Sequence, residues 1–195
     1  MMAVIVKGDL VAGDVKRRMI QETVAALARK GLQGASFSEV LAASGAPRGS
    51  LYHHFPGGKD ELVLDAMDAA GAWALSALGE RRGQPAEEIA EAFIGLWRFV
   101  LNRSDFAAGC AIAAVTVATR EPDQLDRAAA LFRGWRTHLA ALFAAGGVEV
   151  LRADNLAALL IASCEGAVVL ARAERSFDSF DRVMAEVLAA VHGAA

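Results

Sequence analysis

The stretch SFSEVLAASGAPRGSLYHHFPGGKDEL, residues 36–62, decides the fold of the N-terminal part of this chain. Ser36, with a glutamate three residues later, forms a capping-box pattern that starts a short helix. Gly45 permits a sharp turn after that helix, and Pro47 suits the first turn of a second helix. The second helix must end before Pro56 and the glycine pair that follows it. The stretch therefore predicts two short helices, a break, and the start of a longer helix.

The second of these helices has two different faces, and we call it the reader helix. At about 100° per residue, Leu51 and Phe55 point the same way and are expected to pack inward. Tyr52 and His53 lie towards the opposite side, where small and polar groups suit phosphate and base-edge contacts in a major groove. This is the arrangement of a helix-turn-helix. The candidate DNA-binding residues are Ser36, Arg48, Gly49, Ser50, Tyr52, His53, His54 and Lys59.

Lys59 has two interpretations. It opens a helix, where the macrodipole disfavours a cation unless an anion docks there. A phosphate of the DNA backbone is one such anion. The alternative is a solvated lysine in a glycine turn, and the sequence leaves both open. Lys16 and the two arginines after it pose the same choice, between DNA backbone and a solvated face.

The stretch GAPRGSLYHHFPGGKDEL, residues 45–62, resembles the helix-turn-helix signature of TetR-type transcriptional regulators. The proline in the turn and the doubled glycine resemble the subgroup that includes LmrA- and YxaF-like repressors. GCAIAAVTVA, residues 109–118, resembles the regulatory domain of that subgroup. The resemblance is strong over roughly residues 14–65 and looser over the rest. It implies a DNA-binding domain followed by a helical regulatory domain.

Composition agrees with a helical protein that carries one basic end. The chain has 195 residues, a net charge of −3 and an apolar fraction of 55%. Abundant alanine and leucine with only four prolines favour an all-α fold. Basic residues exceed acidic ones over residues 1–60, and the reverse holds afterwards, as expected for a DNA-binding end on an acidic body.

Hydrophobic stripes along the chain predict about nine helices and no strands. We expect a flexible N-terminal arm over residues 1–13, the helix-turn-helix domain over residues 14–60, and a regulatory and dimerisation domain over residues 61–195. A helix from Lys59 to Leu78 enters the body without a linker, so motion of the body can move the reader helix. The last two helices are expected to start at Asp154 and Asp178.

The body carries many large aromatic residues, and a helical bundle of this kind often encloses an apolar ligand site. Each aromatic side chain alone fits a plain core as well. Glu165 sits among apolar residues, where an unpaired carboxylate is costly. It can pair with Arg98 or Arg136, face a solvated groove, or meet a polar group of a ligand. The candidate ligand-binding residues are Trp73, Phe93, Trp97, Phe106, Cys110, Trp135 and Glu165.

The last two helices are rich in alanine and glycine, which let helices approach closely. Paired with a second copy they would form a four-helix interface. The resemblance implies the same homodimer, whereas packing within one chain is the alternative.

Other classes of site lack support in the sequence. We find no catalytic constellation, cofactor motif or metal-ligand spacing, so the chain is not expected to be an enzyme. Cys110 and Cys164 are expected as reduced core thiols. The longest apolar run is too short to span a bilayer and holds Glu165 at its middle, so we expect no membrane association and a cytoplasmic protein.

Two hypotheses follow. The first is a repressor that binds a palindromic operator as a homodimer and is released by a small apolar or aromatic effector. Its two reader helices would lie roughly 34–36 Å apart, one turn of B-DNA. The alternative is a helical ligand-sequestering protein that no longer reads DNA. The sequence does not distinguish a repressor from an activator, because the direction of regulation depends on the position of the operator.

Overall fold

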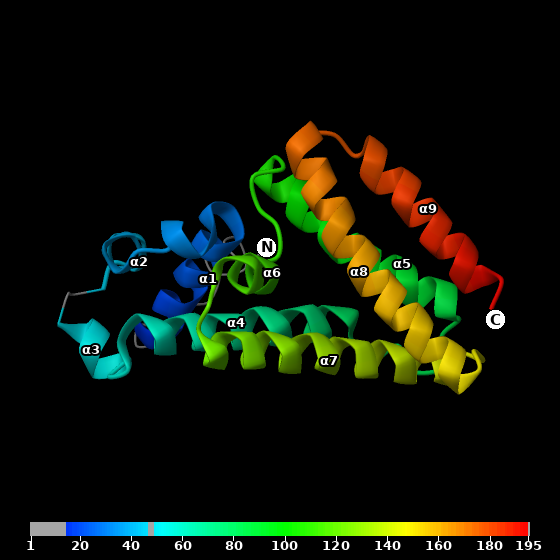
Figure 1. Cartoon of the computed structure of the whole chain (residues 1–195), viewed down its shortest axis with the longest axis horizontal. Helices are drawn as coiled ribbons and strands as arrows, with labels where there is room; N and C mark the ends of the chain where they lie inside the picture. The colour runs from blue at the N-terminus through cyan, green and yellow to red at the C-terminus, as the bar shows by residue number, and fades with distance from the viewer. Residues whose placement is uncertain (1–14, 47–48, 195) are drawn as a thin grey trace. The chain divides into compact units, whose positions relative to one another are not determined.

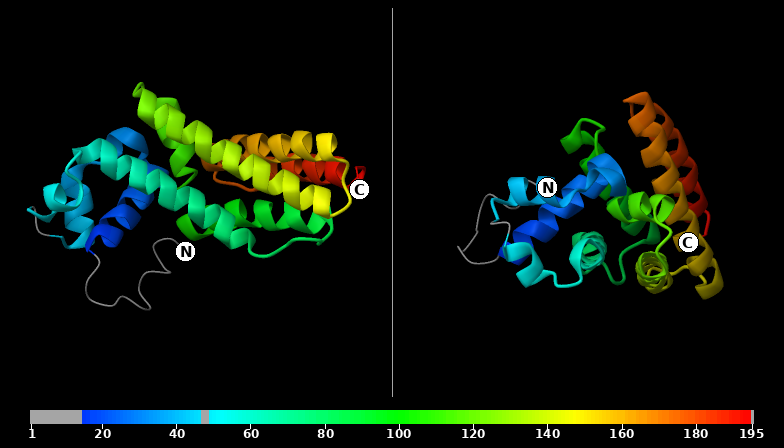
Figure 2. Two further views of the ribbon diagram at one scale, coloured as in Figure 1. Left: turned by 90° about the horizontal axis from the view of Figure 1, so that it is seen from below. Right: turned by 60° about the vertical axis from the view of Figure 1, so that its left-hand side comes forward.

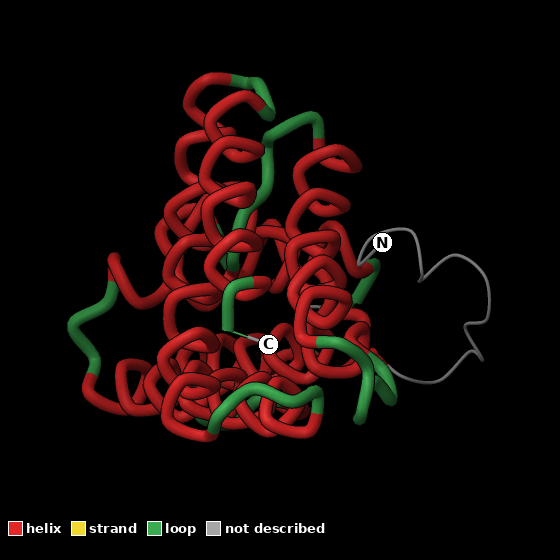
Figure 3. The backbone as a smooth tube through the Cα atoms, turned by 90° about the vertical axis from the view of Figure 1, so that its right-hand side faces the viewer, coloured by secondary structure: helices red, strands yellow, loops and turns green. Residues whose placement is uncertain are grey.

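The computed structural model of the chain describes residues 15–46 and 49–194, so the expected N-terminal arm lies outside the described residues. These residues form helices and connecting loops and contain no strand, as predicted (Figures 1 and 3). The helices are α1 (Val15–Gly34), α2 (Phe37–Ser44), α3 (Ser50–His54), α4 (Gly58–Leu78), α5 (Ala86–Ser104), α6 (Ala111–Ala118), α7 (Pro122–Ala145), α8 (Val150–Glu174) and α9 (Asp178–His192).

The helices form two compact units that do not follow chain order. The first unit takes its described residues from Met1–Ala72 and Cys110–Ala129, and the second from Trp73–Gly109 and Ala130–Ala195. Packing therefore groups α6 with the N-terminal helices. The expected division into residues 14–60 and 61–195 remains our proposal for the functional domains.

A small apolar core holds the first unit together. Met19 of α1, Val40 of α2, Leu51 of α3 and Leu62 of α4 meet around Phe55, and each is at most 3% exposed. With eight and five residues, α2 and α3 are too short to be stable alone in water, so burial of this shared face supplies the stabilisation. The core thus anchors α3 from its inner side.

The N-terminal part of α4 is also tied to its neighbours in the first unit through its aspartates. Asp60 accepts a hydrogen bond from Gln124 Nε2 of α7, at 3.1 Å. Asp68 pairs with Arg127, one turn further along α7. These contacts fix α4 against α7 immediately after the reader helix.

The second unit is built on α5, α8 and α9, and both views in Figure 2 keep α8 and α9 side by side. α8 buries one face, which includes Leu160, Cys164 and Val168, and leaves its opposite face exposed. Cys164 is a free thiol whose pKa is raised by burial. Cys110 is also buried, as expected for a core thiol.

Arg98 of α5 ties α9 to the second unit. Its guanidinium pairs with Asp181 and lies over the rings of Phe177 and Phe180, at 4.9 and 5.3 Å from the centroids. An arginine can stack and pair at once because its charge is planar and delocalised. The contact joins residues far apart in sequence and fixes the start of α9.

The segment after α5 has an unusual backbone. Asp105 and Phe106 are consecutive non-glycine residues in the left-handed region, with φ of 52° and 58°. The ring of Phe106 contacts that of Phe177, with centroids 4.9 Å apart, and Arg172 donates a hydrogen bond to the carbonyl of Ala107 at 3.2 Å. Partners on α8 and before α9 thus hold this segment in place.

The start of α8 differs from the expectation. α8 starts at Val150 and not at Asp154, because the Glu149 carboxylate accepts hydrogen bonds from the backbone N–H groups of Leu151 and Arg152. Those hydrogen bonds lower the pKa of Glu149. In α1, Gly31 has a φ of 71° and interrupts the helix, and helical turns continue beyond it to Gly34.

One helix among the described residues, Val150–Glu174, is long and apolar enough to cross a bilayer by length and composition. A core helix passes the same test, and α8 packs one face on α5 and α9. Its apolar character is therefore weak evidence for a membrane.

Truncating a side chain on the inner face of α3 should affect stability much more than truncating one on its outer face. Phe55→Ala should lower the free energy of unfolding by about 3–5 kcal/mol, because it empties a fully buried site. Tyr52→Ala should change it by less than about 0.5 kcal/mol, because Tyr52 is 68% exposed. Urea unfolding followed by circular dichroism measures both. Equal losses in the two variants would mean that α3 is oriented differently.

Candidate nucleic-acid interface and ligand region

The turn before the reader helix is built as its sequence predicts. The Ser36 hydroxyl accepts a hydrogen bond from the N–H of Glu39 at 3.3 Å, which caps α2. Gly45 takes a left-handed conformation with φ of 66°, and its N–H closes the last turn of α2 onto the carbonyl of Leu41. A residue with a Cβ would be strained there.

Glu39 also links α2 to α1. Its Oε1 lies 2.9 Å from the ammonium of Lys30, and this contact lowers the pKa of the Glu39 carboxyl. The backbone N–H of Ser36 acts in the same direction. The linkage therefore favours the folded state above the ordinary carboxyl pKa, and it is lost as the pH falls through the lowered pKa of the folded state.

The outer face of α3 is exposed within this unit. Leu51 is 3% exposed and Phe55 is fully buried, whereas Tyr52 and His53 point outward as predicted. His54 is half-buried, and its ring contacts that of His53 edge-on, with centroids 5.0 Å apart. A five-residue helix thus presents Tyr52 and His53 outward from a buried apolar support, with His54 partly exposed beside them.

The other candidate DNA-binding residues have different surroundings. Gly49 precedes α3, and a Cβ built on it would meet nothing within 4 Å. Ser36 uses its hydroxyl for the cap and for a 3.1 Å hydrogen bond with Ser38. Arg48 lies outside the described residues, and of Ser50 only the backbone is described.

Lys59 has a protein partner that the sequence did not indicate. Its Nζ donates a hydrogen bond to the carbonyl of Leu32, near the end of α1, at 3.3 Å. A helix C-terminus carries partial negative charge, which favours a cation at this place. The lysine is half-buried and still has two other N–H groups. The two residues are 27 positions apart, so no local pattern could reveal the contact.

The glycine pair before Lys59 shapes the start of α4. Gly58 has φ of 74°, which only glycine adopts without strain. The N–H of Gly57 donates to the Glu61 carboxylate at 2.8 Å. The turn between α3 and α4 is therefore closed by one side chain and one special backbone conformation.

Three of the candidate ligand-binding residues come together in the second unit. Phe93 and Trp97 of α5 and Trp135 of α7 are mutual neighbours, with ring centroids 6.1–6.3 Å apart. Phe132 lies one turn before Trp135 on α7 and joins them, with the two ring centroids 5.5 Å apart. The Nε1 atom of Trp97 is buried and has no hydrogen-bond partner among the described residues.

The remaining ligand candidates lie elsewhere. The ring of Phe106 contacts Phe177, and Trp73 is half-buried near the end of α4. Cys110 belongs to the first unit, where its Sγ accepts the N–H of Ala113 at 3.4 Å and caps α6. Glu165 is half-buried on α8.

The two arginines considered as partners of Glu165 have other partners in the structure. Arg98 pairs with Asp181, and Arg136 Nε lies 3.2 Å from an oxygen of Asp154. Both pairs join helices of the second unit. Sequence reasoning could not rank these partners, because all of the acidic residues involved are distant from the arginines along the chain.

Two family models match the chain in order. Residues 20–66 match the model of bacterial regulatory proteins of the tetR family. Residues 85–186 match the model of the C-terminal domain of LmrA/YxaF-like transcriptional regulators.

Curated relatives agree with these models. An HTH-type transcriptional regulator of Mycobacterium tuberculosis (strain ATCC 25618 / H37Rv) is 39% identical over 175 residues, which cover 86% of this chain and 89% of that protein. The HTH-type transcriptional regulator LmrA of Bacillus subtilis is 36% identical over 56 residues, which cover 29% of this chain and 30% of that protein.

Solved structures share the fold. Regulatory protein TetR from Rhodobacter sphaeroides superimposes with a TM-score of 0.81 at 21% identity, over 91% of this chain and 99% of that one. A TetR transcriptional regulator from Chloroflexus aurantiacus gives a TM-score of 0.76 at 25% identity, over 92% and 94% of the two chains.

Proposed function

Because the chain belongs to the TetR family of DNA-binding transcriptional regulators, with a C-terminal domain of the LmrA/YxaF-like type, we propose that it is a ligand-released repressor. Members of this family regulate transcription and are not enzymes. In our proposal a homodimer binds a palindromic operator and leaves it when a small apolar or aromatic effector binds the body. Such a regulator acts where the chromosome is, so we place it in the cytoplasm.

The exposed outer face of α3 is the observation that carries the proposal. Tyr52 and His53 stand outward on a helix whose inner side is held by Leu51 and Phe55. Tyrosine hydroxyl and imidazole groups donate hydrogen bonds to phosphates and bases. We assign these residues, with Arg48, Gly49, Ser50 and His54, to the operator contact.

We also assign Ser36 and Lys59 to contacts with the DNA backbone. The contact of Lys59 with the Leu32 carbonyl supports a preset position for the ammonium. A side chain that is already ordered loses less conformational entropy on binding. The start of α4 adds backbone N–H groups and a positive dipole, which favour a phosphate.

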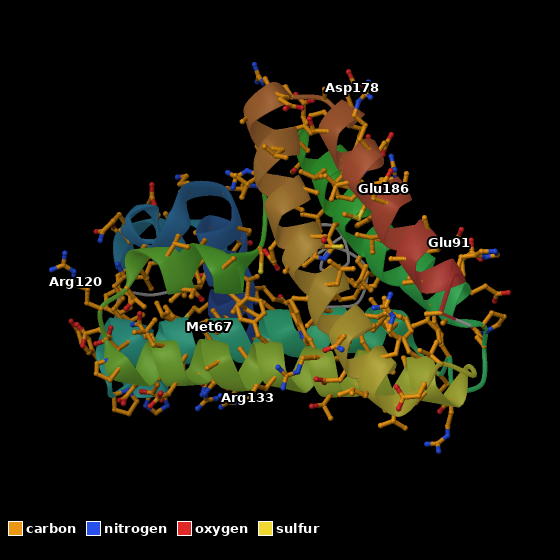
Figure 4. The ribbon with its side chains drawn as sticks, turned by 45° about the vertical axis from the view of Figure 1, so that its right-hand side comes forward. Met67, Glu91, Arg120, Arg133, Asp178 and Glu186 are labelled. Atoms are coloured by element: carbon orange, nitrogen blue, oxygen red, sulfur yellow. The ribbon has the colours of Figure 1, made fainter. Side chains whose placement is uncertain are left out.

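The exposed face of α8 supports a homodimer. Its small and apolar exposed residues recur three or four positions apart, which places them on one stripe. They are Ala158, Leu159, Ala162, Gly166, Val169, Leu170 and Ala173. On α9, Ala185 and Ala189 are exposed as well, while Asp178 and Glu186 project from that helix into solvent (Figure 4). We propose that the last two helices of two copies pack along these faces.

The aromatic group of Phe93, Trp97, Phe132 and Trp135 supports an effector site in the body. Edge-to-face rings provide apolar surfaces for a planar compound. The unpartnered Nε1–H of Trp97 favours an effector that carries a hydrogen-bond acceptor, since an unmet buried donor costs about 1–3 kcal/mol. Trp73, Phe106, Cys110 and Glu165 remain candidates for ligand contacts outside this aromatic group.

Operator binding is tested with labelled DNA fragments from the intergenic region upstream of the gene. We expect specific binding by the wild-type protein and at least a ~30-fold loss in Tyr52→Ala plus Lys59→Ala, because each dimer loses both contacts twice. The slope of log affinity against log salt should fall by about 2. Fluorescence anisotropy measures both quantities.

Arg133→Ala is the matched control for the loss of a cation. Arg133 is exposed and projects from α7 of the second unit (Figure 4). It should leave affinity unchanged. Retained specific binding in the double variant would contradict the roles given to Tyr52 and Lys59, and no specific binding by the wild type would favour the ligand-sequestering alternative.

The dimer face is tested with Gly166→Arg. A Cβ at Gly166 meets nothing within 4 Å in the protomer, so the arginine fits the fold but should block close approach of a second α8. We expect the dimer to dissociate at least ~30-fold more readily by sedimentation analysis. Gly134→Arg is the control, because Gly134 is an exposed helix glycine of α7 with equal space. Equal effects of both changes would exclude this face.

The effector region is tested with the aromatic dye 1-anilinonaphthalene-8-sulfonate, whose sulfonate accepts hydrogen bonds. Trp97→Phe keeps a ring and removes the N–H, so we expect the dye to bind roughly tenfold more weakly. Dye fluorescence measures affinity, and urea unfolding checks that the variant stays folded. Unchanged affinity would mean that the Trp97 N–H does not meet the ligand.

A further inference from the structure

Lys16, in the first turn of α1, makes two contacts that converge on the reader helix. Its Nζ lies 2.9 Å from Oδ2 of Asp65 on α4. The same ammonium lies over the ring of Phe55, at 5.1 Å from the centroid. Lys16 therefore joins α1 and α4 at the residue that ends α3.

Phe55 controls the direction of α3. It is fully buried, and its N–H donates to the carbonyl of Leu51 at 2.8 Å, which closes the last turn of the helix. A helix of five residues has few hydrogen bonds of its own and takes its orientation from its packing. A cation placed on the face of Phe55 therefore restrains the helix that carries Tyr52.

The position of Lys16 on α1 is unfavourable by itself. The first turn of α1 contains no acidic residue, and the helix macrodipole disfavours a cation there. The carboxylate of Asp65 and the ring of Phe55 offset this cost. The same ammonium makes both contacts, so the pair with Asp65 helps to keep it over the ring.

We propose that Lys16 is a positioning residue of the reader helix, held by Asp65 against Phe55, and that it acts on operator affinity through the orientation of α3. The inference rests on the proposed DNA-binding function. It assigns the Asp65 carboxylate a part in DNA recognition although an acidic group repels phosphate.

The sign of the Asp65 effect separates positioning from direct phosphate contact. If Lys16 bound a phosphate, Asp65→Asn would release the ammonium and remove a negative charge, so affinity would rise. If Lys16 positions α3, Asp65→Asn should weaken specific binding in the same direction as Lys16→Met. The two changes should then be less than additive, because both break one contact.

The experiment compares full-length wild type, Lys16→Met, Asp65→Asn, the double variant and Lys16→Arg by fluorescence anisotropy on the operator fragment and on unrelated DNA. We expect a roughly tenfold loss of specific affinity in Lys16→Met, in Asp65→Asn and in the double variant, since each dimer carries two such cation–π contacts. The salt slope should stay at the wild-type value. Lys16→Arg should keep the affinity near the wild-type value, because a guanidinium group can both pair with a carboxylate and stack on a ring.

Tyr52 gives a direct readout of helix orientation, since it is the single tyrosine of the chain. With 3-fluorotyrosine incorporated, the fluorine resonance of the free protein should shift or broaden in Lys16→Met and Asp65→Asn. Arg29→Met, which removes an exposed cation from the same helix, should leave it unchanged. A general loss of stability would instead appear in urea unfolding, without a selective change in the fluorine resonance of Tyr52.

Each outcome decides one question. Tighter binding by Asp65→Asn, or a smaller salt slope in Lys16→Met, would overturn the positioning role and assign Lys16 to phosphate. Unchanged affinity and unchanged fluorine spectra would overturn it as well. A wild-type protein without specific affinity for any fragment would instead refute the proposed function, independently of Lys16.

Discussion

Burial of Phe55 is the constraint on which the N-terminal unit depends. Its ring lies in a core shared by α1, α2, α3 and α4, so one side chain sets the relation between the reader helix and its support. A short helix exposed on one side would fray in water without such an anchor. The exposure of Tyr52 is therefore a consequence of packing on the opposite face.

Ion pairs around this core fix the positions of the helices relative to one another, but they contribute little to the stability of the fold. The pairs of Lys16 with Asp65, Lys30 with Glu39 and Arg127 with Asp68 are partly exposed, and such pairs contribute at most about 1 kcal/mol each. They join three different helix pairs of the same unit. The pairs link α1, α2, α4 and α7 around the core on which the reader helix packs.

Local signals predicted the helix-turn-helix well. Gly45 and the spacing of Leu51 and Phe55 fixed the turn and the inward face, because both depend on residues close in sequence. The contacts of Lys59 with the Leu32 carbonyl and of Arg98 with Asp181 could not be predicted, because folding brings their partners from 27 and 83 positions away. The start of α8 was mispredicted for another reason. The residue that caps this helix is Glu149, and glutamate is not one of the preferred N-cap residues.

The strained segment at Asp105 and Phe106 has a consequence for how the chain acquires its structure. Two left-handed non-glycine residues cost roughly 1–2 kcal/mol each, and the offsetting hydrogen bond to Ala107 comes from Arg172, 65 positions later. A nascent chain that has not yet emerged as far as α8 lacks that partner. Local hydrogen bonds, such as that from the Phe106 N–H to the Leu101 carbonyl, can form together with α5. The connection into α6 should therefore gain its remaining stabilising contact only after translation has passed α8.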